Sequence, residues 1–289
     1  MQISLGAIWG LISLFSWGVG DYLARIYSTK FGSLRTAFYI RFISLFPPLL
    51  IFPVQAYLGQ LYNPTDWTVV LQLGPILGTV LALAAVAYYR GLETGTVSIV
   101  VAVTSAWFGV GVILAFILLG EVLSIQQALI IGIIAIGIIM LSGLRTSAKG
   151  KSTGFLYGLA SMFLLGTATL LFKYLGEASG SIMTSFVGSV GSIIVLWIWL
   201  RISGLKVVLP KREGIQVLMI AGLLEAGGVL AMIIGLSQAP IFIVAPLSAA
   251  HPIVTMLLAL IFLKERLSRV QSVGVMLTVL GVIALSANG

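Results

Sequence analysis

The sequence predicts an all-α integral membrane protein with ten transmembrane helices, arranged as two inverted repeats of five helices each. Three observations lead to this prediction. Hydrophobic residues make up 60% of the 289 residues and charged residues only 8%, whereas soluble domains usually contain about 25% charged residues. Ten apolar stretches are long enough to cross a hydrocarbon core that needs roughly 20 residues per helix. Parts of the first half of the chain also recur in the second half.

The ten apolar stretches follow one another along the chain and are separated only by short links. A transmembrane barrel would instead show alternating segments of about ten residues. These stretches are continuous, and they contain the small-residue pairs Gly6/Gly10 and Gly154/Gly158, which suit close helix packing. In chain order, the predicted helices are centred near Leu14, Phe46, Gly78, Trp107, Ile134, Met162, Ser192, Glu225, His251 and Leu277.

An internal duplication divides the chain into halves. The sequence EVLSIQQ at 121–127 recurs as ERLSRVQ at 265–271, which is 265 − 121 = 144 positions later. Near the amino end, GAIWGL at 6–11 matches GFLYGL at 154–159, with an offset of 154 − 6 = 148. Because each copy crosses the membrane an odd number of times, the second copy is inverted. We expect a first repeat at 1–144, a polar linker at 145–153 and a second repeat at 154–289.

Both copies of the duplicated phrase predict a helix start. Ser124 with Gln127, and Ser268 with Gln271, form the pattern of a capping box, so the fifth and tenth helices should begin there. Glu121 and the equivalent Glu265 precede these starts. Each is interpreted either as a helix-end carboxylate held by a nearby Arg or Lys, or as a gate that pairs in one conformation only.

Positive charge is distributed unevenly between the two sides of the predicted bundle. Of the 16 lysines and arginines, only Lys173 belongs to an even-numbered link. Cytoplasmic links collect Lys and Arg, so the odd links are expected in the cytoplasm and both termini outside the plasma (inner) membrane. This confinement to links argues against nucleic-acid binding. The chain has no cysteine, which excludes disulfides and Cys-based metal sites, and no metal or cofactor is expected.

Three sequence features together resemble a known family. They are LGEVLS at 119–124, its counterpart LKERLS at 263–268, and Trp17-Gly18 in the first helix. The chain resembles the EamA-type branch of the drug/metabolite transporter superfamily. This resemblance implies ten helices in two inverted repeats, and transport, often export, of metabolites, amino acids, sugars or drugs. Family members commonly keep both termini in the cytoplasm, which is opposite to the orientation that the charges predict here.

Glu225 is a single carboxylate in the middle of the eighth apolar stretch. Ionisable groups inside membrane helices are costly and are usually functional. Ala221, Gly222 and Gly228 lie on the same helical face, so this face should meet another helix or a cavity rather than lipid. The carboxylate is interpreted either as a transport residue or as a structural hydrogen-bond anchor.

His251 is expected at the same depth as Glu225. Each residue lies 13 positions from Gln238, near which the eighth and ninth helices turn back on each other. The two side chains should line one polar cavity, where they could exchange protons as a solute moves. The alternative for His251 is a hydrogen bond to a backbone carbonyl. The matching residues of the first repeat are Leu81 and Trp107, so proton chemistry would be confined to one repeat.

Three prolines, Pro240, Pro246 and Pro252, predict that the ninth helix is interrupted. Prolines inside a helix release the carbonyls four residues earlier, which here belong to Phe242 and Ser248. Interrupted helices often build binding sites in transporters, although prolines also simply kink membrane helices. The first repeat carries Phe108 where the second has Pro252, so the halves have diverged here.

The first two helices add further candidates. Ser13, Trp17 and Gly20 share one face of the first helix, where Trp17 could stack on a solute or serve core packing. Asp21 and Arg25 are spaced as a surface ion pair, and Tyr88 and Tyr89 are typical of an interfacial belt. The candidate solute-binding or coupling residues are Glu225, His251, Ser248, Trp17, Trp107 and Ser13. The candidate gate residues are Glu121, Glu265 and Arg41, although Arg41 could also extend to the cytoplasm.

These features predict a secondary carrier that moves a small organic solute by alternating access, with the solute, membrane lipid and protons as partners. No nucleotide is expected, because the sequence lacks a phosphate-binding loop. Alternatives are a lipid-linked or divalent-cation carrier and a passive channel. An intramembrane hydrolase built on Ser248, His251 and Glu225 is a remote alternative, since no nucleophile elbow is recognisable. The protein is not expected to be an enzyme.

Overall fold

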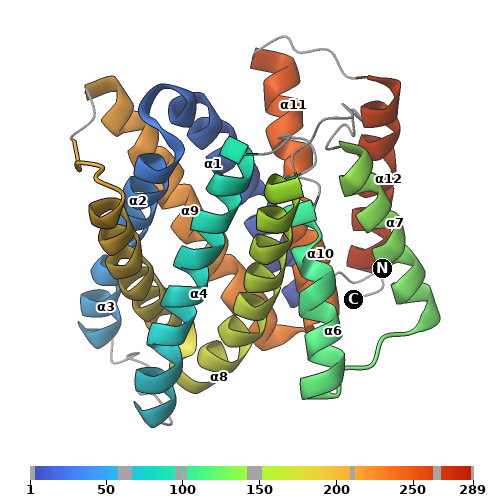
Figure 1. Ribbon diagram of the computed structural model, residues 1–289. Helices are drawn as coiled ribbons and strands as arrows, with labels where there is room; N and C mark the ends of the chain where they lie inside the picture. The colour runs from blue at the N-terminus through green and yellow to red at the C-terminus, as the bar shows by residue number, and fades with distance from the viewer. Residues whose placement is uncertain are drawn as a thin grey trace.

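The computed structural model describes residues 4–57, 67–94, 100, 103–141, 152–208, 212–262 and 268–287. Every regular element in these ranges is an α-helix (Figure 1). In chain order the helices are α1 (Leu5–Phe31), α2 (Ser33–Ser44), α3 (Phe46–Tyr57), α4 (Trp67–Thr94), α6 (Trp107–Leu119), α7 (Ile125–Leu141), α8 (Ser152–Ile202), α9 (Arg212–Gln238), α10 (Ile241–Ala249), α11 (Pro252–Phe262) and α12 (Arg269–Ala287).

Seven helical segments in the described ranges are long and apolar enough to cross a membrane. The prediction of an all-helical, multi-pass membrane protein is therefore confirmed. The longest segment, within α8, runs over 50 residues and would measure about 75 Å if straight, which far exceeds a hydrocarbon core of about 30 Å. At Gly180 the backbone is non-helical, with φ 74° and ψ 161°, and the chain turns back there (Figure 1).

The predicted starts of two helices are confirmed. The Ser124 N–H donates to Gln127 Oε1 (2.9 Å), and the Gln127 N–H donates to Ser124 Oγ (3.2 Å). The equivalent distances at Ser268 and Gln271 are 3.0 and 3.3 Å. α7 and α12 each begin at the residue after the serine, because the two reciprocal bonds satisfy backbone donors that a helix start leaves unpaired.

The span formed by α10 and α11 is interrupted, although its prolines act differently from the prediction. Pro252 begins α11, but Pro240 caps the start of α10 and is not inside a helix. The Ser248 carbonyl, expected to be unpaired, accepts a hydrogen bond from the His251 N–H at 3.2 Å. The prediction of an unpaired carbonyl was wrong because the chain tightens into a three-residue turn at the break. This turn brings the His251 N–H to the Ser248 carbonyl.

The corresponding span of the first repeat is interrupted at the matching position. Ala106 leaves the helical path immediately before α6, and its N–H donates to the Val103 carbonyl at 3.2 Å. Ala106 corresponds to Ala250 at the 144-residue offset. Phe108 stands where the second repeat has Pro252, so the break does not depend on proline.

Close contacts between helices also recur in the two halves. A methyl group added at Gly18 of α1 would lie 2.8 Å from the carbonyl oxygen of His251. A methyl group at the equivalent Gly166 of α8 would lie 2.8 Å from the carbonyl oxygen of Trp107, the residue that matches His251. The duplicated sequences therefore pack in a duplicated way, with glycines allowing two helices to approach the two breaks.

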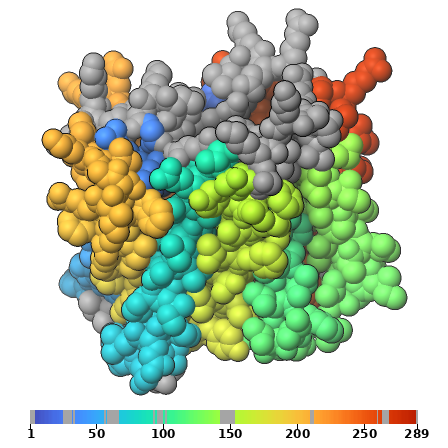
Figure 2. Space-filling model, viewed as in Figure 1, coloured from blue at the N-terminus to red at the C-terminus, as the bar shows by residue number. Residues whose placement is uncertain are grey.

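The two most extensive helix interfaces are α4 with α8 and α1 with α9. Under the repeat relation, α1 corresponds to the first part of α8, and α4 corresponds to α9. Side chains of α4 and α8 lie directly against each other on the face shown in Figure 2. The ends of α4 and α8, and the starts of α9 and α12, carry arginines and all lie toward the top of Figure 1.

Candidate functional site

Two aromatic side chains and the single histidine meet where the two helix breaks face α1. The ring of Trp17 lies 6.0 Å from the ring of His251 and 6.4 Å from that of Trp107, measured between centroids, with both pairs edge-on. Trp107 follows the first break and His251 lies in the second. Trp17 therefore lies between two residues that occupy equivalent positions in the two repeats.

Several polar atoms around Trp17 are buried and lack a hydrogen-bond partner among the described residues. They are the indole nitrogen of Trp17 and the hydroxyl groups of Ser13 and Ser248. Both serines are fully buried. The Trp17 indole also lies against Gly228 of α9, where an added methyl would approach its nitrogen to 2.6 Å. Buried polar atoms are rarely left without partners, so these three are available to bind a solute or water.

Glu225 of α9 forms an ion pair with Arg41 of α2, with 2.8 Å between its Oε1 and the Arg41 Nη1. Only 19% and 15% of the two side chains is exposed, and both residues lie within candidate membrane spans. Arg41 therefore pairs with Glu225 and does not extend along α2 to the helix end. Close packing of Ile43 of α2 against Gly222 of α9 brings the two charges together.

His251 pairs with Asp21 of α1, with 3.0 Å between its Nδ1 and the Asp21 Oδ2. The sequence had suggested an ion pair between Asp21 and Arg25, whose side chain lies outside the described part of the structure. Asp21 lies one turn beyond Trp17 on the same face of α1. It therefore reaches the histidine whose ring contacts Trp17.

Glu225 and His251 lie at similar heights along α1 but do not pair with each other. The backbone nitrogen of Glu225 lies beside Gly20, and the carbonyl of His251 lies beside Gly18. The two side chains do not face each other as a pair, because Glu225 is bound to Arg41 of α2 and His251 to Asp21 of α1. That they line one cavity stays a prediction. The rotation of each helix about its axis decides which partner a side chain faces, and this rotation cannot be read from spacing along the chain.

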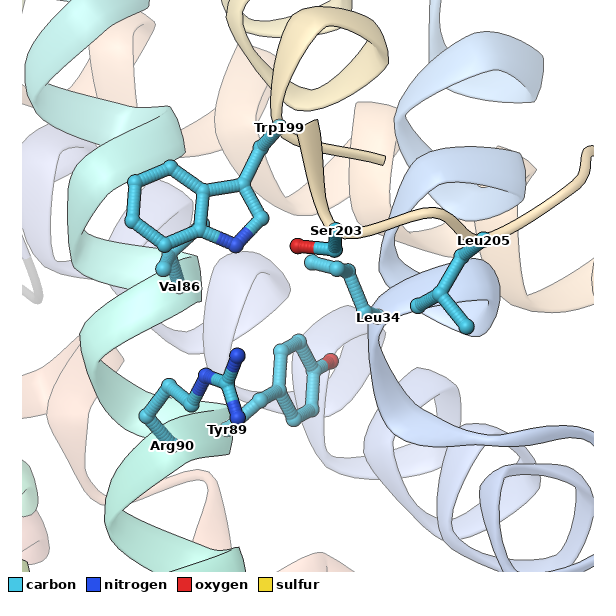
Figure 3. Close-up of a pocket in the computed structure, with 7 residues that line it drawn as sticks. All are labelled: Leu34, Val86, Tyr89, Arg90, Trp199, Ser203 and Leu205. Atoms are coloured by element: carbon cyan, nitrogen blue, oxygen red, sulfur yellow. The ribbon is translucent and has the colours of Figure 1, made fainter. Parts of the chain in front are cut away.

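Tyr89 of α4 lies within electrostatic range of Asp21, Glu225 and Arg41. The sequence placed Tyr89 in an interfacial aromatic belt, and no motif marks it as a site residue. Tyr89 also borders a cavity of about 70 Å³ (Figure 3). The cavity lies between α2, α4 and the end of α8, and its lining residues are Leu34, Val86, Tyr89, Arg90, Trp199, Ser203 and Leu205.

A second cluster of charges lies near the opposite end of the bundle. Glu121, in the link between α6 and α7, places Oε1 3.3 Å from the Lys173 Nζ. Its Oε2 accepts a hydrogen bond from the Ile241 N–H at 2.8 Å. Lys173 also donates to the Leu236 carbonyl at 3.1 Å. Glu121 thus holds α8, α9 and α10 to the first repeat, while Glu265 lies outside the described residues.

Three long-range ion pairs among the described residues join one repeat to the other. Asp21, Arg41 and Glu121 belong to the first repeat, and their respective partners are His251, Glu225 and Lys173 of the second. A motion of one repeat against the other would therefore rearrange these contacts directly.

The described residues do not form the hydrolase arrangement that can be drawn from the sequence. Ser248 Oγ makes no hydrogen bond within the described part of the chain, His251 Nδ1 faces Asp21, and Glu225 is bound to Arg41. Within the same ranges, no group of three or more acidic or histidine side chains is placed to hold a metal ion.

Comparison with known proteins agrees with the fold. The model of the EamA-like transporter family matches residues 4–143 and 152–287. An uncharacterized protein of Methanocaldococcus jannaschii is 29% identical over 136 residues, which cover 47% of this chain and 98% of that protein. A solved crystal structure with 15% identity superposes with a TM-score of 0.77, covering 96% of this chain and 95% of that chain, and so shares the fold. The chain therefore belongs to the EamA-like transporter family, in agreement with the drug/metabolite transporter superfamily that its sequence resembles.

Proposed function

We propose that this protein is a secondary carrier that moves a small organic solute past Trp17 by alternating access. The observation that carries the proposal is the Arg41–Glu225 ion pair, which is largely shielded and joins the two repeats inside candidate membrane spans. Buried ion pairs contribute little to stability on balance, because desolvation offsets their attraction. Ionisable groups at such depth are therefore better explained by transport than by folding.

We propose ten membrane crossings in two inverted repeats. The seven candidate spans give eight crossings if α8 is counted twice at Gly180, and the two shorter apolar segments Val103–Leu119 and Ile125–Leu141 bring the number to ten. α1 and the first part of α8 run in opposite directions in Figure 1, which supports inversion. The positive-inside rule assigns the arginine-rich end to the cytoplasm and both termini to the outside.

The chemistry around Trp17 favours a solute with both apolar and polar parts. The rings of Trp17 and Trp107 offer aromatic surface, and Ser13 and Ser248 offer hydroxyl groups that have no partner among the described residues. Arg41 and Glu225 provide charges of both signs nearby. A solute that binds Arg41 would take the place of Glu225, and a solute that binds Glu225 would take the place of Arg41. Solute binding would then break the contact between the two repeats and so change their relative stability in each conformation.

The two ends of the bundle differ: one is held closed by charged contacts between the repeats, and the other contains a cavity. The Glu121–Lys173 cluster ties the first repeat to α8, α9 and α10 near the end that carries the termini. The cavity beside Tyr89 lies toward the arginine-rich end. We propose that the structure represents a conformation closed at the Glu121 end, and that Glu121 acts as a gate.

Proton coupling is part of the proposal. Protonation of Glu225 would remove the charge that holds Arg41, and a charged His251 would bind Asp21 more strongly than a neutral one. Both changes act on contacts between the repeats. Proton binding could therefore bias the exchange between conformations without contacting the solute.

Thermal stabilisation of the detergent-purified protein tests the solute class. The library comprises amino acids, sugars, nucleosides, organic acids and cationic drugs, since a ligand that binds only the folded protein raises its stability. Hits are then measured by counterflow in proteoliposomes, where a carrier saturates and a channel does not.

Two variants on the same helix make this test specific. Glu225→Gln should abolish counterflow, whereas Glu213→Gln, at the exposed start of α9, should not change it. Full counterflow by folded Glu225→Gln would contradict the proposed role of the ion pair. Absence of any hit would instead favour the lipid-linked or divalent-cation carrier.

A further inference from the structure

We infer that the cavity between α2, α4 and the end of α8 binds the phosphate group of a membrane lipid. This site lies beside the proposed solute pathway, and its occupancy does not depend on transport. Its lining residues come from α2, α4, α8 and the segment that follows α8. Figure 3 shows the Trp199 nitrogen, the Ser203 hydroxyl and the Arg90 guanidinium turned toward a common space.

The cavity contains a buried donor that needs an acceptor. The indole nitrogen of Trp199 is buried and has no hydrogen-bond partner among the described residues. Indole N–H groups can only donate, and an unpaired buried donor is unfavourable. Figure 3 shows this nitrogen on the side of the ring that faces Ser203 and Arg90. An oxygen-rich group in the cavity would accept from it.

The remaining polar groups favour an anion. Arg90 contributes a guanidinium, and Ser203 contributes a hydroxyl group that can also donate. None of the described residues that line the cavity is acidic. Asp21 and Glu225 act on Tyr89 together with Arg41, so the charge of Arg90 is the one that belongs to the lining itself. An arginine with two additional donors, from Trp199 and Ser203, suits a phosphate.

The wall formed by residues 203–208 is fixed against α2. The Arg35 Nε donates to the Lys206 carbonyl at 3.1 Å, and the Tyr39 hydroxyl donates to the Val208 carbonyl at 2.9 Å. Gly204 has φ 68°, a left-handed conformation that lets the chain turn back at the end of α8. The cavity is thus held by bonds that do not involve its ligand.

The surroundings favour a lipid over a dissolved phosphate. Ile194, Trp197 and Ile198 of α8 are exposed over 53%, 45% and 44% of their surface, respectively. They precede Ser203 by about one and a half to two and a half helical turns. Acyl chains could lie against them. The arginines and tryptophans at this end are typical of the level where lipid phosphates lie.

Native mass spectrometry of the delipidated full-length protein tests the site with three probes. These are phosphatidylglycerol, phosphatidylcholine and glycerol 3-phosphate. We expect phosphatidylglycerol to bind best, phosphatidylcholine to bind more weakly because its choline is repelled by the basic surroundings, and glycerol 3-phosphate to compete poorly. Arg90→Gln should weaken phosphatidylglycerol binding roughly tenfold, and Trp199→Phe by about threefold, since each removes one hydrogen-bonding group from the phosphate.

Control variants outside the site separate it from general attraction to a basic surface. Arg212→Gln at the exposed start of α9 and Trp67→Phe at the opposite end of α4 from Arg90 should leave binding within about twofold of the unmodified protein. Arg90→Lys keeps the charge and should retain most of the binding, which would show that the loss in Arg90→Gln does not come from misfolding. Equal weakening by Arg212→Gln and Arg90→Gln would overturn the proposal.

Two further outcomes would overturn the assignment in different ways. Equal competition by glycerol 3-phosphate would make a soluble phosphate the occupant, and no phosphate binding at all would leave a water-filled cavity. Glu225→Gln should bind phosphatidylglycerol normally, so a failure of the transport proposal is distinguishable from a failure of this one.

Discussion

Two shielded ion pairs join the repeats at different heights, and their surroundings differ. Glu121 and Lys173 are bound to backbone as well as to each other, because Glu121 accepts from the Ile241 N–H and Lys173 donates to the Leu236 carbonyl. Arg41 and Glu225 meet through their side chains, beside aromatic rings and polar atoms that lack partners. The first pair is suited to holding helices together. The second is suited to exchanging its partner for a solute.

The largest effect is expected when Arg41 is removed. Arg41→Ala leaves the Glu225 carboxylate shielded without a counter-charge, which should destabilise the protein by about 3–5 kcal/mol and abolish transport. The thermal unfolding midpoint in detergent and counterflow in proteoliposomes measure the two effects. Arg212→Ala, at the exposed start of α9, is the control. The exchange Arg41→Glu with Glu225→Arg should recover stability, and a pair as unstable as the single variant would contradict a direct ion pair.

A smaller but directional effect is expected at Glu121. Glu121→Gln keeps an acceptor for the Ile241 N–H but loses the attraction to Lys173, so the end near the termini should open more often. The chain has no cysteine, so Ser13→Cys, at a fully buried position, reports opening through its reaction with an impermeant maleimide. We expect labelling to be about tenfold faster, equivalent to the loss of about 1.4 kcal/mol from a charged hydrogen bond.

The matched control for Glu121 is Glu177→Gln. Glu177 lies 3.7 Å from the same lysine but is 54% exposed, and exposed pairs are worth little. Its labelling rate should stay near that of the parent protein. Equal acceleration by both variants would show that the general charge around Lys173, rather than the bound position of Glu121, controls the opening.

The third expected effect concerns pH. His251 Nδ1 lies 3.0 Å from Asp21 Oδ2, and this contact joins the two repeats. His251→Gln should therefore flatten the pH dependence of counterflow if this contact carries the coupled proton. Glu213→Gln should retain the parent profile. An unchanged profile in His251→Gln would make this residue structural.

The smallest effect is expected at the helix break of the second repeat. The first repeat is interrupted at Ala106 without a proline, so Pro252→Ala should preserve the break and cost only about 0.4–1 kcal/mol, mainly through greater freedom of the unfolded chain. The thermal midpoint and retained solute binding measure this. A loss of binding with normal stability would show that Pro252 positions His251.

Features that depend on local spacing could be predicted from the sequence. The capping boxes at Ser124 and Ser268 formed as expected, because a capping box involves only four consecutive residues. The similar heights of Glu225 and His251 followed from equal distances to one turn. The role of each site residue in transport stays a prediction, as do the repeat boundaries and the part of the gate formed by Glu265.

The sequence by itself determined that this protein lies in a membrane and is helical, because a membrane requires long apolar helices whose backbone groups are hydrogen-bonded internally. The repeated phrases also showed that the chain is duplicated. Only the tertiary structure decided which charges meet. Asp21 pairs with His251, Arg41 turns toward Glu225, and Trp199 faces a cavity. The physical reason is that such contacts depend on how each helix is rotated and packed, and the small residues that allow this packing are alike on many helices.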